Sequence, residues 1–160
     1  MSDYEKLYSK VFKILGDLTP LNVDCGVLCN RACCKGNENE GMRLFPFETT
    51  TLNIKETEYG EKLAVCNGTC NRNQRPLSCR IFPFFPTVDH KGKIYVEVDW
   101  RAKNLCPLIE HSDELFFNRK FFKSLKKVGK ILSKNNKCLE FLQKNTEEID
   151  IYSKFLKWYK

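Results

Sequence analysis

The sequence predicts an α+β protein in which a loop-rich, cysteine-clustered lobe with one β-hairpin packs against several helices. Apolar residues recur at helical spacing near both ends of the chain, one central segment alternates with the period of a strand, and eight of the nine cysteines lie between residues 25 and 106. A chain of 160 residues fits one domain. We therefore expect a single domain over 1–160, with a cysteine-cluster region at 20–110 and a C-terminal helical region at 111–160.

The N-terminal segment predicts a helix over residues 3–16, with Gly16 as its stop. Its apolar residues recur every three or four positions, at Tyr4, Leu7, Tyr8, Val11 and Ile14. Charged residues interrupt this segment, so it lacks the apolar run of a signal peptide, and no stretch of the chain has the length of a membrane span. We expect a cytoplasmic protein that does not associate with membranes.

The middle of the chain, from 20 to 107, holds all six prolines and has weak apolar periodicity, which favours loops. A hairpin is the exception. The segment FFPTVD is followed by the turn HKGK and by IYVEVD, in which Ile94, Val96 and Val98 alternate with polar residues as in a half-buried strand. His90 is expected at the surface of that turn. Pro76 is expected to begin a short helical turn that carries Cys79.

Two further helices are predicted over 113–134 and 136–158, joined at the polar sequence KNNK. Ser112 or Asp113 is a candidate N-cap for the first helix, and Asn145 and Thr146 are expected to break the second into two pieces. Cys138 aligns with the apolar residues of the second helix, so it is interpreted as a core residue.

The remaining cysteines have the spacing of metal ligands. Short C-x2–4-C steps let a tight turn present two thiolates to one ion, and clustered cysteines in a reducing compartment more often bind metal than form disulfides. The candidate ligands are Cys25, Cys29, Cys33, Cys34, Cys66, Cys70, Cys79 and Cys106. Eight thiolates fill two tetrahedral sites, and the neighbours Cys33 and Cys34 are expected to serve two sites or one multinuclear cluster. The alternative is a set of buried free thiols.

The elements CGVLCNRACCKG, EGMRLFPFE, CNGTC, RPLSCRIFP and LCP, in this order, resemble the YkgJ-type cysteine-cluster family. The resemblance covers about residues 22–108 and implies a zinc- or iron-chelating domain whose ligands fall on the same eight cysteines. Family members often show C-x2-C-x2-C-C, whereas this chain has C-x3-C-x3-C-C. A similar motif occurs in the longer flagellin lysine-N-methylases, but methyl transfer is not carried over to this chain.

The metal is expected to be Zn²⁺ or iron, with an iron–sulfur cluster as one form of the latter. The C-x3-C turns suit zinc, whereas a cysteine followed by proline, as at Cys106, also occurs at ferredoxin-type clusters. Arg75, Arg80 and Arg101 are candidates to offset the thiolate charge, the alternative being that they are solvated. The aromatic residues Phe82, Phe84 and Phe85 are expected to pack around the site. His111 is a weaker candidate ligand, for which an exposed or capping role is favoured.

The formal net charge is +7, and basic residues concentrate on the predicted helix at 119–134. They are Arg119, Lys120, Lys123, Lys126, Lys127, Lys130 and Lys134. A solvated face is the usual meaning, and an acidic partner is the alternative. Nucleic acid is not supported, because aromatic residues are not interleaved with the lysines.

The absence of a phosphate-binding glycine motif and of a nucleophile–histidine pattern gives no support to a nucleotide-binding or hydrolytic enzyme. The sequence favours a structural or redox metal-binding module. The alternative is a metal-dependent enzyme of redox or group-transfer chemistry that uses an iron–sulfur cluster.

Overall fold

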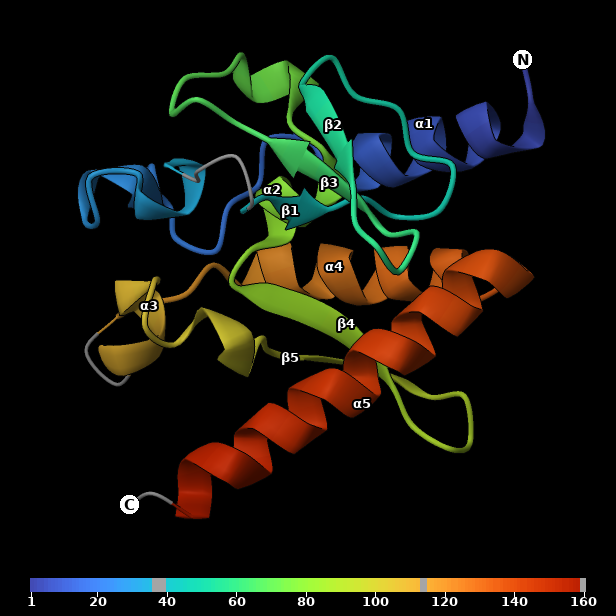
Figure 1. Cartoon of the computed structure of the whole chain (residues 1–160). Helices are drawn as coiled ribbons and strands as arrows, with labels where there is room; N and C mark the ends of the chain where they lie inside the picture. Colours follow the sequence, from blue (N-terminus) through green and yellow to red (C-terminus); the bar gives the residue numbers. More distant parts are fainter. Residues whose placement is uncertain (36–39, 113–114, 159–160) are drawn as a thin grey trace.

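The computed structural model describes residues 1–35, 40–112 and 115–158. The α+β class is confirmed (Figure 1). The helices are α1 (Asp3–Leu15), α2 (Leu77–Ile81), α3 (Pro107–Glu110), α4 (Arg119–Leu132) and α5 (Asn136–Trp158). The strands are β1 (Met42–Arg43), β2 (Asn53–Glu56), β3 (Lys62–Val65), β4 (Phe84–Val88) and β5 (Ile94–Val98). Short 3-10 turns occur at η1 (Cys25–Val27), η2 (Ala32–Cys34), η3 (Arg72–Gln74) and η4 (Trp100–Ala102).

The predicted N-terminal helix is confirmed as α1, and its ends follow from local chemistry. The Ser2 side chain accepts a hydrogen bond from the Glu5 amide while the Glu5 carboxylate accepts one from the Ser2 amide, which completes a capping box. Gly16 ends the helix with a φ of +53°, and its amide donates to the Phe12 carbonyl at 2.8 Å. The sequence signals at both ends of this helix therefore act as expected.

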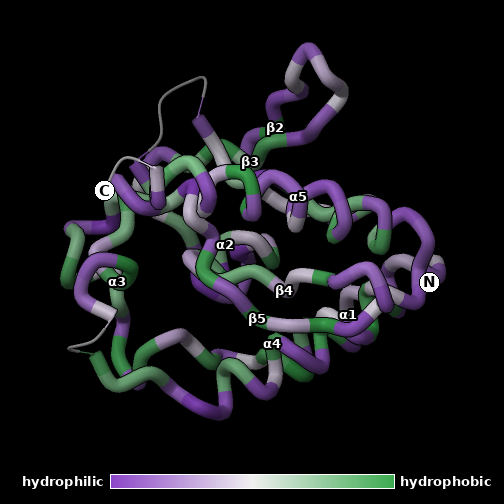
Figure 2. Tube along the Cα trace, turned by 90° about the horizontal axis from the view of Figure 1, so that it is seen from below, coloured by the Kyte–Doolittle hydropathy of each residue, from purple (hydrophilic) through white to green (hydrophobic). Residues whose placement is uncertain are grey.

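The predicted hairpin is also confirmed. Strands β4 and β5 pair in antiparallel register, with Phe84 opposite Val98 and Val88 opposite Ile94. The hairpin lies between α4 and α5, and Figure 2 shows this arrangement from below. All five β4 residues are buried as a result, whereas β5 alternates between buried and exposed positions. The exposed position of His90 in the hairpin turn agrees with the prediction.

Helix α4 approaches the hairpin closely at Gly129. A Cβ atom there would lie 2.7 Å from Cγ2 of Ile94 and 2.8 Å from Cβ of Pro86, so only glycine permits this contact. Leu125 and Val128, on the same side of the helix, are fully buried. The glycine thus sets the distance between α4 and the hairpin.

Aromatic residues fill much of the main core. Phe84 makes edge-on contacts with Phe117, Phe121 and Phe122, at centroid distances of 5.4, 6.2 and 4.8 Å. The ring centroid of Phe85 lies 5.9 Å from that of Phe45. The expectation that Phe84 and Phe85 pack around the cysteines was therefore wrong, since they belong to the core under the helices.

The first C-terminal helix begins later than predicted. Residues 115–118 are not helical, and the Asn118 side chain caps α4 by accepting a hydrogen bond from the Lys120 amide. Ser112 is therefore not its cap, and Asp113 lies outside the described residues. The seven basic residues predicted to form a charged face are all exposed, and α4 contains no acidic residue. An acidic partner for this face stays a prediction.

The predicted break in the last helix was wrong, because α5 runs without interruption through Asn145 and Thr146. Both side chains donate to the carbonyl four residues earlier, Asn145 to Phe141 at 2.9 Å and Thr146 to Leu142 at 2.7 Å. The donors of both side chains are thus satisfied by carbonyls of the same helix, and α5 continues through both residues. Within the described ranges, no helix combines the length and apolar character that crossing a bilayer requires.

A three-stranded sheet of order β1-β3-β2, which the sequence did not predict, lies beside the cysteine region. The strands pair antiparallel, with Met42 opposite Ala64. Gly41 permits the close approach, because a Cβ there would lie 2.7 Å from the Ala64 carbonyl oxygen. Gly41, Met42 and Ala64 form part of the wall of the cavity described below.

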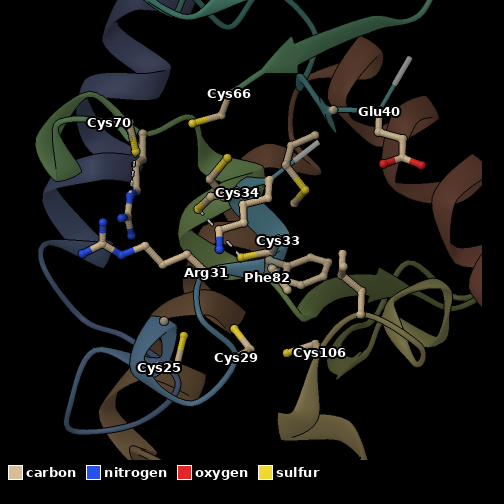
Figure 3. Close-up of a pocket in the computed structure, with 18 of the residues that line it drawn as sticks. Cys25, Cys29, Arg31, Cys33, Cys34, Glu40, Cys66, Cys70, Phe82 and Cys106 are labelled. Carbon is tan, nitrogen blue, oxygen red and sulfur yellow. Dashed lines mark hydrogen bonds between the residues drawn. The ribbon is translucent and has the colours of Figure 1, made fainter. Parts of the chain in front are cut away.

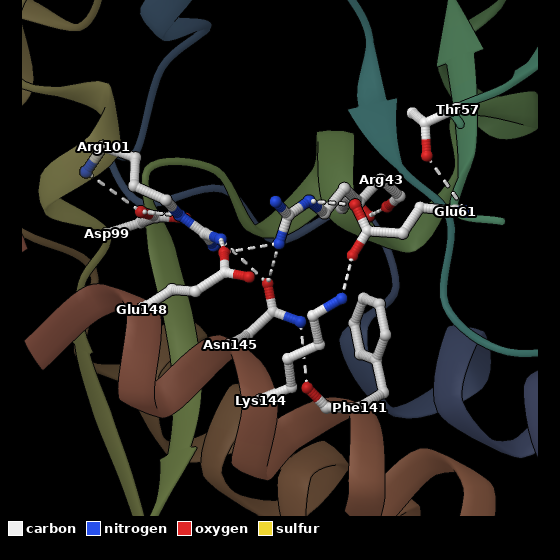
Figure 4. A network of polar contacts seen from close by, with 10 residues as sticks. Arg43, Thr57, Glu61, Asp99, Arg101, Phe141, Lys144, Asn145 and Glu148 are labelled. Carbon is white, nitrogen blue, oxygen red and sulfur yellow. Dashed lines mark hydrogen bonds and ion pairs between the residues drawn. The ribbon is translucent and has the colours of Figure 1, made fainter. Parts of the chain in front are cut away.

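A polar network ties β1 and η4 to α5 (Figure 4). Arg43 and Arg101 each donate through Nη1 to the Glu148 carboxylate, at 2.6 and 2.7 Å, and to Oδ1 of Asn145, at 3.2 and 2.9 Å. Arg101 also pairs with Asp99 at 2.7 Å. The interpretation of Arg101 as a partner of the thiolates was therefore wrong: its guanidinium joins segments that flank the cysteine region to α5.

Candidate metal centre

All eight predicted ligand cysteines line one cavity of about 230 Å³ (Figure 3). Seven of these side chains are half-buried and Cys106 is buried. The ninth cysteine, Cys138, lies in the main core, where its sulfur is 3.9 Å from the Tyr8 hydroxyl oxygen. The structure thus separates the cysteines into the same two sets as the sequence interpretation, with Cys138 apart from the others.

The loop that carries the first four thiols is shaped by short polar turns. The Asp24 carboxylate accepts a hydrogen bond from the Gly26 amide at 3.0 Å and caps η1. Asn30 and Arg31 then adopt left-handed conformations, with φ values of 49° and 57°, and reverse the chain before η2. As a result, the cysteines on both sides of this turn line the same cavity.

The second turn, CNGTC, has the local structure that its sequence predicts. Gly68 has a φ of +97°, and the Asn67 side chain accepts a hydrogen bond from the Thr69 amide at 3.2 Å. Cys66 and Cys70 stand at the two ends of this turn. Lys35 and Asn67 form an isolated antiparallel bridge, which joins this turn to the loop of the vicinal cysteines.

The last two thiols are carried by short helices. Cys79 lies on α2, which begins after Pro76 as predicted, and Glu48 fixes its first turn by accepting a hydrogen bond from the Leu77 amide at 2.6 Å. Cys106 is the N-cap residue of α3, with Pro107 in the first turn. Cys79 therefore reaches the cavity from the middle of a short helix and Cys106 from the start of one.

Burial dominates the electrostatics of several thiols. It raises the pKa of Cys79 to about 12 and that of Cys106 to about 11, and it also raises the pKa values of Cys25 and Cys66. These thiols favour the protonated form in the absence of a cation. A bound metal ion reverses this preference, because it coordinates the thiolate.

The vicinal pair behaves differently. The two sulfurs lie 4.0 Å apart, and their hydrogen bond raises the pKa of Cys33 and lowers the pKa of Cys34 to about 6. The positive charges of Arg75 and Arg31 also lower the pKa of Cys34. One thiolate of the pair is thus favoured near neutral pH.

Three cations face the thiols. Arg75 donates from Nε to the sulfur of Cys70 at 3.2 Å, so the predicted contact of this arginine with the cluster is present. Arg31 and Lys35 line the cavity as well and were not singled out from the sequence, although both stand inside the cysteine motif itself. Two acidic residues, Asp24 and Glu40, also line the wall.

Arg80 does not contact sulfur, contrary to its proposed role. Its guanidinium donates to the carbonyls of Arg75 and Asn73 at 2.9 and 2.6 Å and lies over the Phe12 ring at 4.7 Å. It therefore holds the backbone of the loop that carries Arg75. Phe82 lines the cavity as expected, and His111 is exposed.

The donor set fits a thiophilic metal such as zinc or iron, because eight sulfurs and no histidine line the wall. Among the described residues, no three cysteine, histidine or acidic side chains are gathered closely enough to hold an ion as they stand. Ligation therefore requires the sulfurs to converge from the wall toward an ion.

Comparison with protein-family models found no match, and comparisons with curated proteins and with solved structures found none either. The resemblance to the YkgJ-type cysteine-cluster family stays a prediction that depends on the quoted motifs.

Proposed function

We propose that this protein is a cysteine-ligated metalloprotein that holds zinc or iron in the thiol-lined cavity, as a structural or redox module. The observation that carries the proposal is the partition of the cysteines: eight line one cavity, and the ninth is a core residue. Buried structural thiols pack into apolar cores. Here the thiols face a cavity that is also lined by Arg31, Lys35 and Arg75, whose positive charges would offset the negative charge of a tetrathiolate site.

The weak apolar packing of the cysteine loop supports the same proposal. Val23, Val27 and Leu28 are exposed to 65, 83 and 54%. A segment that buries so little apolar surface gains little hydrophobic stabilisation. Metal coordination is a source of folding free energy that such loops use in small metalloproteins. A zinc ion suits the three C-x3-C turns in particular.

The direct test is metal analysis of protein purified without air. We expect about two zinc ions per chain in a colourless protein, or iron with broad absorption at roughly 400 nm that bleaches on reduction. Cys66→Ser should lower the metal content, and Cys138→Ser is the matched control that should leave it unchanged. Protein that holds neither metal, with the eight cavity thiols accessible to a thiol reagent in the native state, would refute the proposal.

Hydrogen exchange tests the role of the metal in folding. After removal of the metal, amides of residues 25–34 and 66–72 should lose protection, whereas those of α4 and α5 should keep it, because the main core includes no predicted ligand. Protection should return when zinc is added back. Equal protection of the cysteine loops with and without metal would contradict a structural role for the ion.

A further inference from the structure

The eight thiols divide into two groups of four by their neighbours. We define the α3 group as Cys25, Cys29, Cys33 and Cys106, because one member caps α3. We define the α2 group as Cys34, Cys66, Cys70 and Cys79, because one member lies on α2. In Figure 3, Cys25, Cys29 and Cys106 lie together at one end of the cavity, and Cys66 and Cys70 lie toward the other.

The α3 group is brought together by packing. Cys106 is buried in a small apolar cluster with Leu21 and Leu108, and Cys25 packs against the same cluster. The charges of Cys25 and Cys29 raise the pKa of Cys106, and the same two charges raise the pKa of Cys33. Cys25 and Cys29 are therefore neighbours of both Cys33 and the start of α3.

The α2 group is held by backbone pairing. The bridge between Lys35 and Asn67 is antiparallel, so the residues before each of them, Cys34 and Cys66, are diagonal neighbours on one face. The charges of Cys34 and Cys70 raise the pKa of Cys79. The same two charges raise the pKa of Cys66, so these four thiols are neighbours.

The vicinal pair lies at the boundary between the groups. The distance of 4.0 Å between the Cys33 and Cys34 sulfurs does not show whether the two residues bind one ion or two. Two sulfur ligands of one tetrahedral zinc ion also lie about 3.8 Å apart, given Zn–S bonds of about 2.3 Å. The backbone conformation distinguishes the two cases. Both residues belong to the 3-10 turn η2, in which consecutive side chains diverge by about 120°. In agreement with this divergence, the charges of Cys25 and Cys29 raise the pKa of Cys33, whereas the charge of Cys34 raises the pKa values of Cys66 and Cys79.

We propose that the cavity holds two separate four-thiolate ions, one per group, and that the vicinal pair contributes one thiolate to each ion. This assignment rests on the proposed function, because it presupposes that the cavity binds metal. It explains why two cysteines are adjacent in the sequence: a single 3-10 turn supplies a ligand to each site and fixes the sites side by side.

Cadmium-113 NMR of the cadmium-loaded full chain tests the assignment. We expect two cadmium ions per chain and two resonances, both in the range of four-sulfur coordination. Cys25→Ser should change only the α3-group resonance and Cys66→Ser only the α2-group resonance, and both thiols are half-buried, so the packing cost is small. Circular dichroism of each loaded variant should match that of the parent chain.

The decisive comparison is the matched pair Cys33→Ser and Cys34→Ser, which makes one chemical change at adjacent positions. Cys33→Ser should change the resonance that Cys25→Ser changes, and Cys34→Ser should change the one that Cys66→Ser changes. If both variants change the same resonance, or if cadmium–cadmium coupling reveals a bridging thiolate, the assignment is overturned.

Other outcomes separate the two proposals. One iron–sulfur cluster per chain, or a site with three sulfurs and an oxygen by X-ray absorption of the zinc protein, overturns the two-ion assignment but leaves a cysteine-ligated metalloprotein. A parent chain that binds no zinc, cadmium or iron overturns both proposals together.

Discussion

Glu48 is a buried carboxylic acid whose ionisation should make the protein less stable as the pH rises. Its side chain is 6% exposed, and it accepts hydrogen bonds from the amides of Phe45 and Leu77 at 3.1 and 2.6 Å. Burial raises its pKa from 4.5 to about 7 despite these hydrogen bonds. Each pH unit between the unfolded and folded pKa values corresponds to about 1.4 kcal/mol, so the complete effect is about 3 kcal/mol.

The direction follows from proton binding. Between pH 4.5 and about 7 the folded state keeps a proton on Glu48 that the unfolded chain has released. The stabilising contribution is therefore complete below pH 4.5 and is lost as the pH rises through about 7. Glu48→Gln removes the titration, while its amide oxygen can still accept one backbone hydrogen bond, and the loss of the other is independent of pH.

Urea denaturation of the two proteins at pH 5 and pH 8 measures the effect. Relative to the parent chain, Glu48→Gln should gain about 2.5 kcal/mol in the free energy of unfolding between these two pH values, because the unfolded chain has already released part of the proton at pH 5. The Glu48 charge raises the pKa values of Cys79 and Cys138, but burial is the larger cause for both, so these two thiols stay protonated at pH 8 in both folded proteins. Thiol titration therefore largely cancels in the difference. The exposed Glu58→Gln serves as a control that should show no such gain. Parallel pH profiles for the parent and Glu48→Gln would refute the reasoning.

Three further substitutions test the packing and the site. Gly129→Ala places a Cβ 2.7 Å from Cγ2 of Ile94 and should lower the free energy of unfolding by about 1–3 kcal/mol in urea; an unchanged value would show that α4 shifts freely. Cys138→Ser, beside Tyr8 in the core, should cost about 1 kcal/mol and leave the metal content unchanged, and metal loss would contradict its core role. Arg75→Gln should weaken zinc binding about 10-fold in a chelator competition without changing the number of ions, whereas unchanged affinity would make this arginine irrelevant to the site.

The parts of the fold that could be predicted are those whose signal is local. The helix at α1 has caps and an apolar stripe within a few residues, and the hairpin has an alternating strand beside a short polar turn. Cys138 was assigned to the core from its neighbours on one helix face, and it is fully buried. In each case the residues that determine the structure are close together in the sequence.

The parts that could not be predicted depend on distant partners. All four residues of β2 are exposed, so no buried face constrains its sequence, and the strand depends on its pairing with β3. Arg101 was a candidate partner of the thiolates because Cys106 is nearby in the chain, but its partner Glu148 lies far along the sequence on α5. Local spacing identified the cysteines that line the cavity, whereas the grouping proposed for them draws on the three-dimensional bridge between Lys35 and Asn67.

The two parts of the molecule are stabilised by different means. The main core consists of side chains from α1, α2, α4, α5 and the hairpin, together with Phe45, whereas the second apolar cluster is small and counts Cys106 among its members. A proposed metal ligand is thus also a packing residue of the cysteine region. Arg43 and Arg101 join the flanks of that region to α5, so the core can hold the cavity wall in place while the loops rearrange around an ion. Loss of the metal should therefore loosen the cysteine loops without unfolding α4 and α5. The effect of metal binding on stability would then be limited to the cavity and its immediate walls.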